Sequence, residues 1–113
     1  MALTLATVMR DDLANQMDTS INAGAGTSNM KLETSGDVEV ATINFQNPAF
    51  GAASAGVITL AGTPLSDTNA SGGTVAQFSI YDRDNVKQLE GVVAVSGQDL
   101  DLSSLSVGAG DTV

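Results

Sequence analysis

The first two dozen residues carry apolar side chains at a helical spacing. An apolar residue recurs every four positions, with one more beside this stripe, and the set is Leu5, Val8, Met9, Leu13, Met17 and Ile21. Side chains three or four residues apart share one side of an α-helix. The pattern therefore predicts an amphipathic helix within residues 1–24, with its apolar face buried along most of its length. Thr4 is the expected N-cap, and Gly24 is placed where a left-handed C-cap would end the helix.

Beyond residue 29 the apolar period shortens to two, the period of a β-strand. Leu32 begins the alternation, and residues 37–45 then place Val38 and Val40 on one face but Ile43 and Phe45 on the other. This change of parity indicates either a β-bulge or a strand buried on both sides. Further strands are predicted within residues 56–62, 74–81, 86–97 and 98–107.

Turn-forming residues separate these strands. Residues 24–29 and 62–73 are rich in Gly, Ser, Thr and Asn, which is typical of connecting loops. The sequence DRDN at 82–85 predicts a hairpin turn, because Asp and Asn adopt turn dihedrals readily. We therefore expect a single domain over residues 1–113, mainly β with one N-terminal α-helix. Residues 30–113 are expected to form an antiparallel β-sandwich or small barrel of about seven strands.

Composition narrows the partners of such a domain. Its 113 residues include 13 acidic and four basic side chains, which gives a formal net charge of −9. The basic residues are scattered along the chain, whereas nucleic-acid binding normally requires a clustered basic patch. We therefore expect neither a nucleic-acid partner nor an anionic membrane surface. No apolar run approaches the length of a membrane span.

Candidate chemistry is sparse. The chain contains no Cys and no His, so it lacks the thiolate and the commonest metal ligand and general base. We predict no catalytic residue, no metal site and no cofactor, and hence no enzyme. Asp82, Asp84 and Asn85, with Glu90 nearby, only partly match a calcium loop. Asp99 and Asp101 share a strand face but lack the aromatic platform typical of a sugar site.

The stretch NPAFGAASAG at 47–56 places aromatic residues beside the least bulky part of the chain. Small residues allow two backbones to approach closely, and an isolated Phe can anchor a contact between proteins. An alternative is an ordinary connection whose Phe folds back into its own core. On the first interpretation an assembly surface is formed by Phe45, Pro48, Phe50, Gly51 and Ala52.

The chain resembles small structural proteins of tailed bacteriophages, of the kind that decorate or cement the capsid. The resemblance is carried by INAGAGT (21–27), NPAFGAASAG (47–56), FSIYDRDN (78–85) and SGQDLDLSSLSVGAGDTV (96–113). It implies a non-enzymatic virion protein, assembled in the host cytoplasm and located on the outer capsid surface. The implied partners are the major capsid protein and neighbouring copies of the chain, a trimer included. In two respects the chain differs from such proteins. Residues 30–45 are shorter than the matching region, and such proteins tend to continue past GAGDTV (108–113) with a further strand.

Two alternatives remain open at this stage. One is a tail or fibre component of the same kind of virion, which differs from the first interpretation in its location. The other is a free carbohydrate- or calcium-binding β-module, for which the DRDN turn at 82–85 is the expected ligand site.

Overall fold

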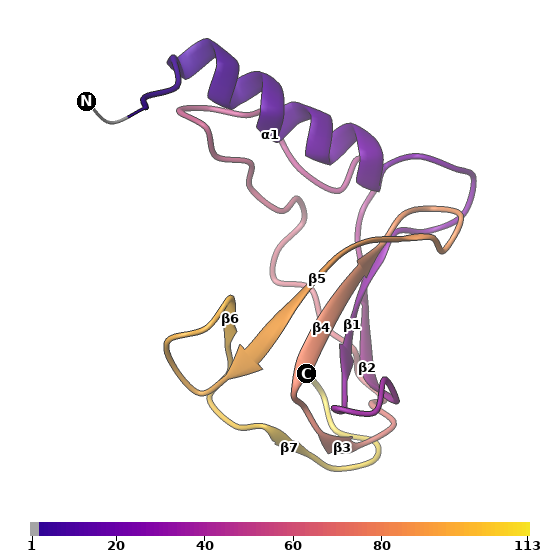
Figure 1. Cartoon of the computed structure of the whole chain (residues 1–113). Helices are drawn as coiled ribbons and strands as arrows, with labels where there is room; N and C mark the ends of the chain where they lie inside the picture. Colours follow the sequence, from indigo (N-terminus) through magenta and orange to yellow (C-terminus); the bar gives the residue numbers. More distant parts are fainter. Residues whose placement is uncertain (1–2) are drawn as a thin grey trace.

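The computed structural model describes residues 3–113, and within that range it contains one helix and seven strands (Figure 1). Helix α1 spans Thr7–Ile21. The strands are β1 (Asn29–Glu33), β2 (Glu39–Asn44), β3 (Gly73–Thr74), β4 (Gln77–Tyr81), β5 (Lys87–Ala94), β6 (Leu100–Asp101) and β7 (Ser106–Val107). The predicted class, mainly β with an N-terminal helix, is confirmed. The first two residues of the predicted helical segment 1–24 lie outside the described residues.

Five strands form one curled sheet in the order β2-β1-β4-β5-β6, and this sheet is a half-barrel. Strands β1, β2, β4 and β5 pair antiparallel, whereas β6 pairs parallel with β5. The expectation of an entirely antiparallel sheet is therefore wrong at β6. The Asp99 carboxylate accepts a hydrogen bond from the Val92 N–H at 3.0 Å, which holds the chain beside β5 and sets Leu100 next to Val93. Strands β3 and β7 form a separate antiparallel pair.

The parity change along residues 37–45 is a β-bulge. Leu32 pairs with Ala41 and Glu33 pairs with Glu39, so Val40 is the extra residue on β2. Val40 and Ala41 are both fully buried although they are adjacent in sequence. The Val40 carbonyl accepts hydrogen bonds from the N–H groups of residues 71 and 72 at 2.8 and 3.2 Å. The loop before β3 thereby covers part of the outer edge of β2.

The core consists of two clusters that share partly buried side chains. The larger lies under the curled sheet and contains Leu32, Val40, Ala41, Ala70, Val75, Phe78 and Val93. The smaller joins the end of α1 to the chain after β2 and contains Ile21, Phe45 and Ala49. Met30 and Ile80 pack against both clusters. The contact between α1 and the core is therefore concentrated at Ile21.

Residues 45–61 form an irregular hairpin-like loop. The Gly51 N–H donates to the Thr59 carbonyl and the Ala61 N–H to the Ala49 carbonyl, both at 2.9 Å. Only isolated bridges connect the two sides, so the strand predicted within residues 56–62 is wrong. The bend between them is a tight turn with positive φ at Ala55 (52°) and Gly56 (79°), and Ser54 and Val57 on either side of it exchange two backbone hydrogen bonds at 2.9 and 3.0 Å. The polar loop predicted at 62–73 is present up to the start of β3.

The helix is shorter than predicted at both ends. Its N-cap is Ala6, which makes no side-chain capping bond, so the prediction of Thr4 is wrong. Its C-cap is Asn22, whose N–H donates to the Asp18 carbonyl at 3.0 Å, and Gly24 (φ 108°) lies in the following turn. Helix α1, the one helix within residues 3–113, is not long and apolar enough to cross a membrane.

Candidate interaction surface

Helix α1 lies across one end of the molecule, beside the loop that follows β2 (Figure 1). Polar side chains of the helix and its C-cap hold this loop by accepting hydrogen bonds from its backbone. The pairs are Asp11 Oδ1 with the Gly56 N–H (2.6 Å), Asn15 Oδ1 with the Ala53 N–H (2.9 Å) and Asn22 Oδ1 with the Ala49 N–H (2.8 Å). The acceptors recur at helical spacing, so the polar side of α1 faces the loop.

The small residues of the loop permit this close approach. A Cβ built on Gly56 would lie 3.1 Å from the Cβ of Arg10, closer than most real contacts of that kind. Gly56 also has a φ of 79°, which is unfavourable for other residues. Close contact with the chain's own helix therefore explains why the stretch that begins at Asn47 consists mainly of small residues.

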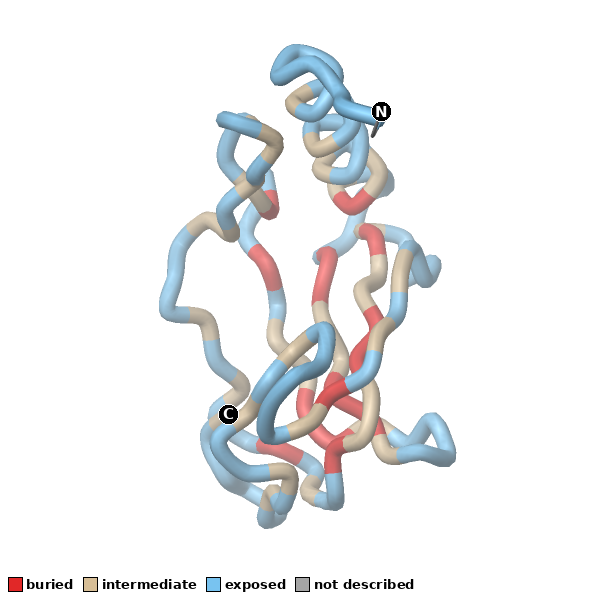
Figure 2. The backbone as a smooth tube through the Cα atoms, turned by 60° about the vertical axis from the view of Figure 1, so that its left-hand side comes forward, coloured by how far each residue is buried: buried red, intermediate tan, exposed pale blue. Residues whose placement is uncertain are grey.

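Most residues of α1 are exposed, as Figure 2 shows by the pale blue along the helix, and the apolar residues are among them. The exposed fraction is 59% at Leu13, 52% at Met9 and 43% at Met17, whereas it is 1% at Ile21. The prediction that this face is buried along most of its length is thus wrong. The loop offers backbone N–H groups and few large side chains, so it pairs with the polar side of the helix and leaves the apolar side uncovered.

A shallow groove of about 390 Å³ runs between α1 and the loop. Leu13, Ala14 and Met17 line its helical side, and Gly56 and Ile58 line the other. Val57, at the tip of the loop, is 61% exposed. We call this region the helix–loop surface and define it by Met9, Leu13, Met17 and Val57.

The residues predicted for assembly separate into two groups. Phe45 is buried and Phe50 is half-buried, with ring centroids 6.1 Å apart and planes tilted by 59°. Both belong to the smaller core cluster. Pro48, Gly51 and Ala52 remain exposed. In the isolated chain, Phe50 therefore packs into its own core, while the exposed part of the predicted surface adjoins the segment that contacts α1.

The predicted turn at 82–85 is confirmed, and its carboxylates bond to the backbone. Asp82 Oδ1 accepts hydrogen bonds from the N–H groups of Asp84 and Val86, both at 2.9 Å. The bond from Val86 is the main cause that lowers the pKa of Asp82, against the opposing effect of burial. Asp84 Oδ1 accepts from the Ala25 N–H at 3.1 Å. These oxygens tie the turn together and join it to the chain after α1.

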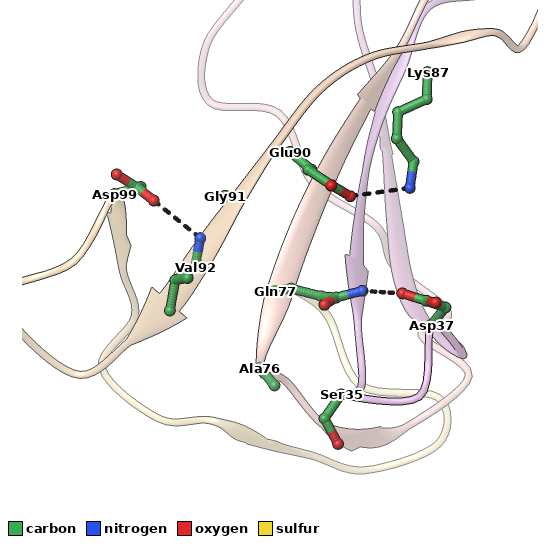
Figure 3. Close-up of a pocket in the computed structure, with 9 residues that line it drawn as sticks. All are labelled: Ser35, Asp37, Ala76, Gln77, Lys87, Glu90, Gly91, Val92 and Asp99. Carbon is green, nitrogen blue, oxygen red and sulfur yellow. Dashed lines mark hydrogen bonds and ion pairs between the residues drawn. The ribbon is translucent and has the colours of Figure 1, made fainter.

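A polar pocket of about 660 Å³ lies over β4 and β5 (Figure 3). Lys87 Nζ lies 3.1 Å from Glu90 Oε2, and this hydrogen bond is the main cause that raises the pKa of Lys87. Gln77 donates to Asp37 on the neighbouring wall. No aromatic side chain is among the residues that line the pocket. Within residues 3–113, no group of three or more Asp, Glu, His or Cys side chains is arranged to hold a metal ion.

The polar side chains that hold the loop have no role in the sequence-based candidate site. In the sequence, Asp11, Asn15 and Asn22 form the polar side of an amphipathic helix, and such a side is usually expected to face solvent. Their spacing of four and seven residues is the one available signal.

Comparisons with protein-family models, with curated proteins and with solved structures find no match to this chain.

Proposed function

We propose that this chain is a non-enzymatic structural protein of a tailed bacteriophage virion. It attaches to the outer surface of the major capsid protein shell through the helix–loop surface. The observation that carries the proposal is the exposed apolar side of α1, on which Met9 (52%), Leu13 (59%) and Met17 (43%) follow one another at four-residue spacing. An exposed apolar surface of this kind is typical of a protein–protein contact. The sequence resemblance of residues 47–56 and 78–85 to capsid decoration proteins supports the choice of partner.

The size of the surface supports attachment at many repeated positions. At 1.5 Å per residue, the 15 residues of α1 extend about 22 Å. One side of such a helix is smaller than the roughly 800 Å² that each partner contributes to a standard stable interface. A single copy therefore binds modestly, and contacts with neighbouring copies on the shell, in a trimer for example, add to its retention.

The charge of the chain fits this arrangement. A net charge of −9 makes free copies repel one another, which limits association through the exposed apolar side before a shell is available. Attachment to the outside also keeps the acidic chain away from packaged DNA.

The test compares purified variants for binding to shells assembled without this protein, measured by co-sedimentation. The double variant Met9→Ser/Leu13→Ser removes two apolar contacts worth about 2 kcal/mol together, so its Kd should rise about thirtyfold. The control is Val38→Ser/Val95→Ser, which changes two valines that are each 62% exposed and lie outside the helix–loop surface. The control should bind as the unmodified chain does. Equal binding of both double variants, or no binding by the unmodified chain, would overturn the proposal.

A further inference from the structure

A second cavity, separate from the helix–loop surface, lies between the sheet and the loop after β2. Its volume is about 400 Å³. Its floor is one cross-strand row of the sheet, because Met30 on β1 pairs with Ile43 on β2 and with Ile80 on β4. We call it the apolar cavity.

The loop forms its roof. Phe45 and Phe50 line the cavity with their rings 6.1 Å apart, and Leu60 lies beside them through its bridge to Phe50. The roof residues are held by isolated bridges and not by a continuous ladder. Most of the lining side chains are half-buried, and Thr63 and Pro64 are exposed. A small molecule therefore reaches the cavity without unfolding of the sheet.

The lining defines the chemistry of an occupant. None of the ten lining residues carries a charge, and the Thr63 hydroxyl is their one side-chain polar group. An ion placed here would lose its hydration without gaining a partner, so a charged ligand is disfavoured. Water is also disfavoured, because an ordered buried water normally makes two to four hydrogen bonds. The volume lies within the range of roughly 300–1,000 Å³ that is typical of small-molecule sites.

We propose that the apolar cavity binds an uncharged apolar small molecule, either an aliphatic chain or an aromatic ring system. The floor of branched and flexible side chains contacts one face of the ligand, and the Phe45 and Phe50 rings contact the other. The proposal does not depend on attachment to a capsid shell.

The test is a fluorescence titration of the full chain with N-phenyl-1-naphthylamine, a neutral apolar dye. Saturable binding with one dye per chain is expected. Ile43→Trp fills the cavity from its floor and Leu60→Asp places a charge in its roof, and each should raise the Kd at least tenfold. Leu13→Ser is the matched control on the helix–loop surface and should leave the Kd unchanged. Circular dichroism establishes that each variant is folded.

Localisation by NMR keeps the test decisive if a cavity variant fails to fold. In the unmodified chain, the dye should shift the amide signals of Phe45, Phe50 and Leu60. Shifts confined to residues 8–17, or loss of binding in Leu13→Ser alone, would place the dye on the helix–loop surface and overturn the inference. Absence of saturable binding would overturn it as well. Neither result affects the shell-binding test, in which the dye has no part.

Discussion

The outward orientation of α1 makes a quantitative prediction about two residues of the same helix. Leu13 and Ile21 both belong to the apolar stripe, but Leu13 is 59% exposed and Ile21 is 1% exposed. Truncation of each to Ala removes a similar aliphatic side chain. Because the two side chains differ so much in burial, the two substitutions should differ greatly in their effect on the free energy of unfolding.

The magnitudes follow from burial. Ile21 packs with Phe45 and Ala49, and Ile→Ala at a buried site costs about 2 to 5 kcal/mol, so we expect about 3 kcal/mol for Ile21→Ala. At Leu13 the lost burial is partial, and Ala is a slightly better helix former than Leu, which offsets part of the loss. We expect Leu13→Ala to cost less than about 1 kcal/mol.

Urea unfolding measures both values. Far-UV circular dichroism follows the whole chain, and fluorescence of Tyr81, the one tyrosine, follows the sheet. With a slope of about 1 to 3 kcal/mol per molar urea, Ile21→Ala should lower the midpoint by roughly 1 to 3 M, whereas Leu13→Ala should lower it by less than about a third as much. Equal losses in the two variants would refute the reasoning, because they would mean that the apolar side of α1 is buried in the free chain.

Three further predictions concern single contacts. Gly56→Ala should lower the free energy of unfolding in urea more than Gly97→Ala does. Both glycines have a positive φ, 79° and 77°, but an added Cβ would contact another residue, Arg10, only at Gly56. Equal losses of stability would contradict the helix–loop contact. Ser79→Ala should cost about 1 to 3 kcal/mol, because it removes the 2.6 Å hydrogen bond to the buried Glu33 carboxylate, and an unchanged midpoint would argue against that bond. At Asp67, hydrogen bonds from the N–H groups of Thr42 and Asn69 hold the pKa below its ordinary value of 3.8. The ionised Asp67 therefore contributes stability above pH 3.8 that is lost as the pH falls through the lower folded pKa. As the pH falls below 3.8, the free energy of unfolding of Asp67→Asn should therefore decrease less than that of the unmodified chain. Parallel profiles of unfolding free energy against pH would contradict this role of Asp67.

Local spacing was enough to predict the elements whose signals are strong. The four-residue apolar period identified α1, the DRDN sequence identified the turn at 82–85, and the parity change identified a bulge as one of two options. The helix and the turn depend on neighbouring residues alone. The sequence did not decide between bulge and doubly buried strand, because that choice depends on the pairing of Leu32 and Glu33 in another strand.

Orientation and pairing at a distance could not be predicted. The apolar stripe marks one side of α1, but which side meets the protein depends on what the covering segment supplies. Residues 47–56 supply backbone N–H groups that need acceptors, and Asn15 is one of the side chains that satisfy them. The parallel pairing of β6 with β5 is accompanied by a hydrogen bond from the Val92 N–H to the Asp99 carboxylate. The spacing of apolar residues along the sequence does not predict this bond. Likewise, an aromatic anchor and a core aromatic look the same in sequence, so the position of Phe50 had to come from the structure.

The proposed attachment to a capsid shell is tested most directly by the number of copies of this chain in virions. Quantitative mass spectrometry of separated heads and tails gives this number per major capsid subunit. Copies are expected in the head fraction, between roughly one per capsid subunit and one per few subunits, because the attachment site is repeated over the shell. A handful of copies confined to the tail fraction would instead support a tail or fibre component. Absence of the chain from both fractions would contradict attachment to a virion.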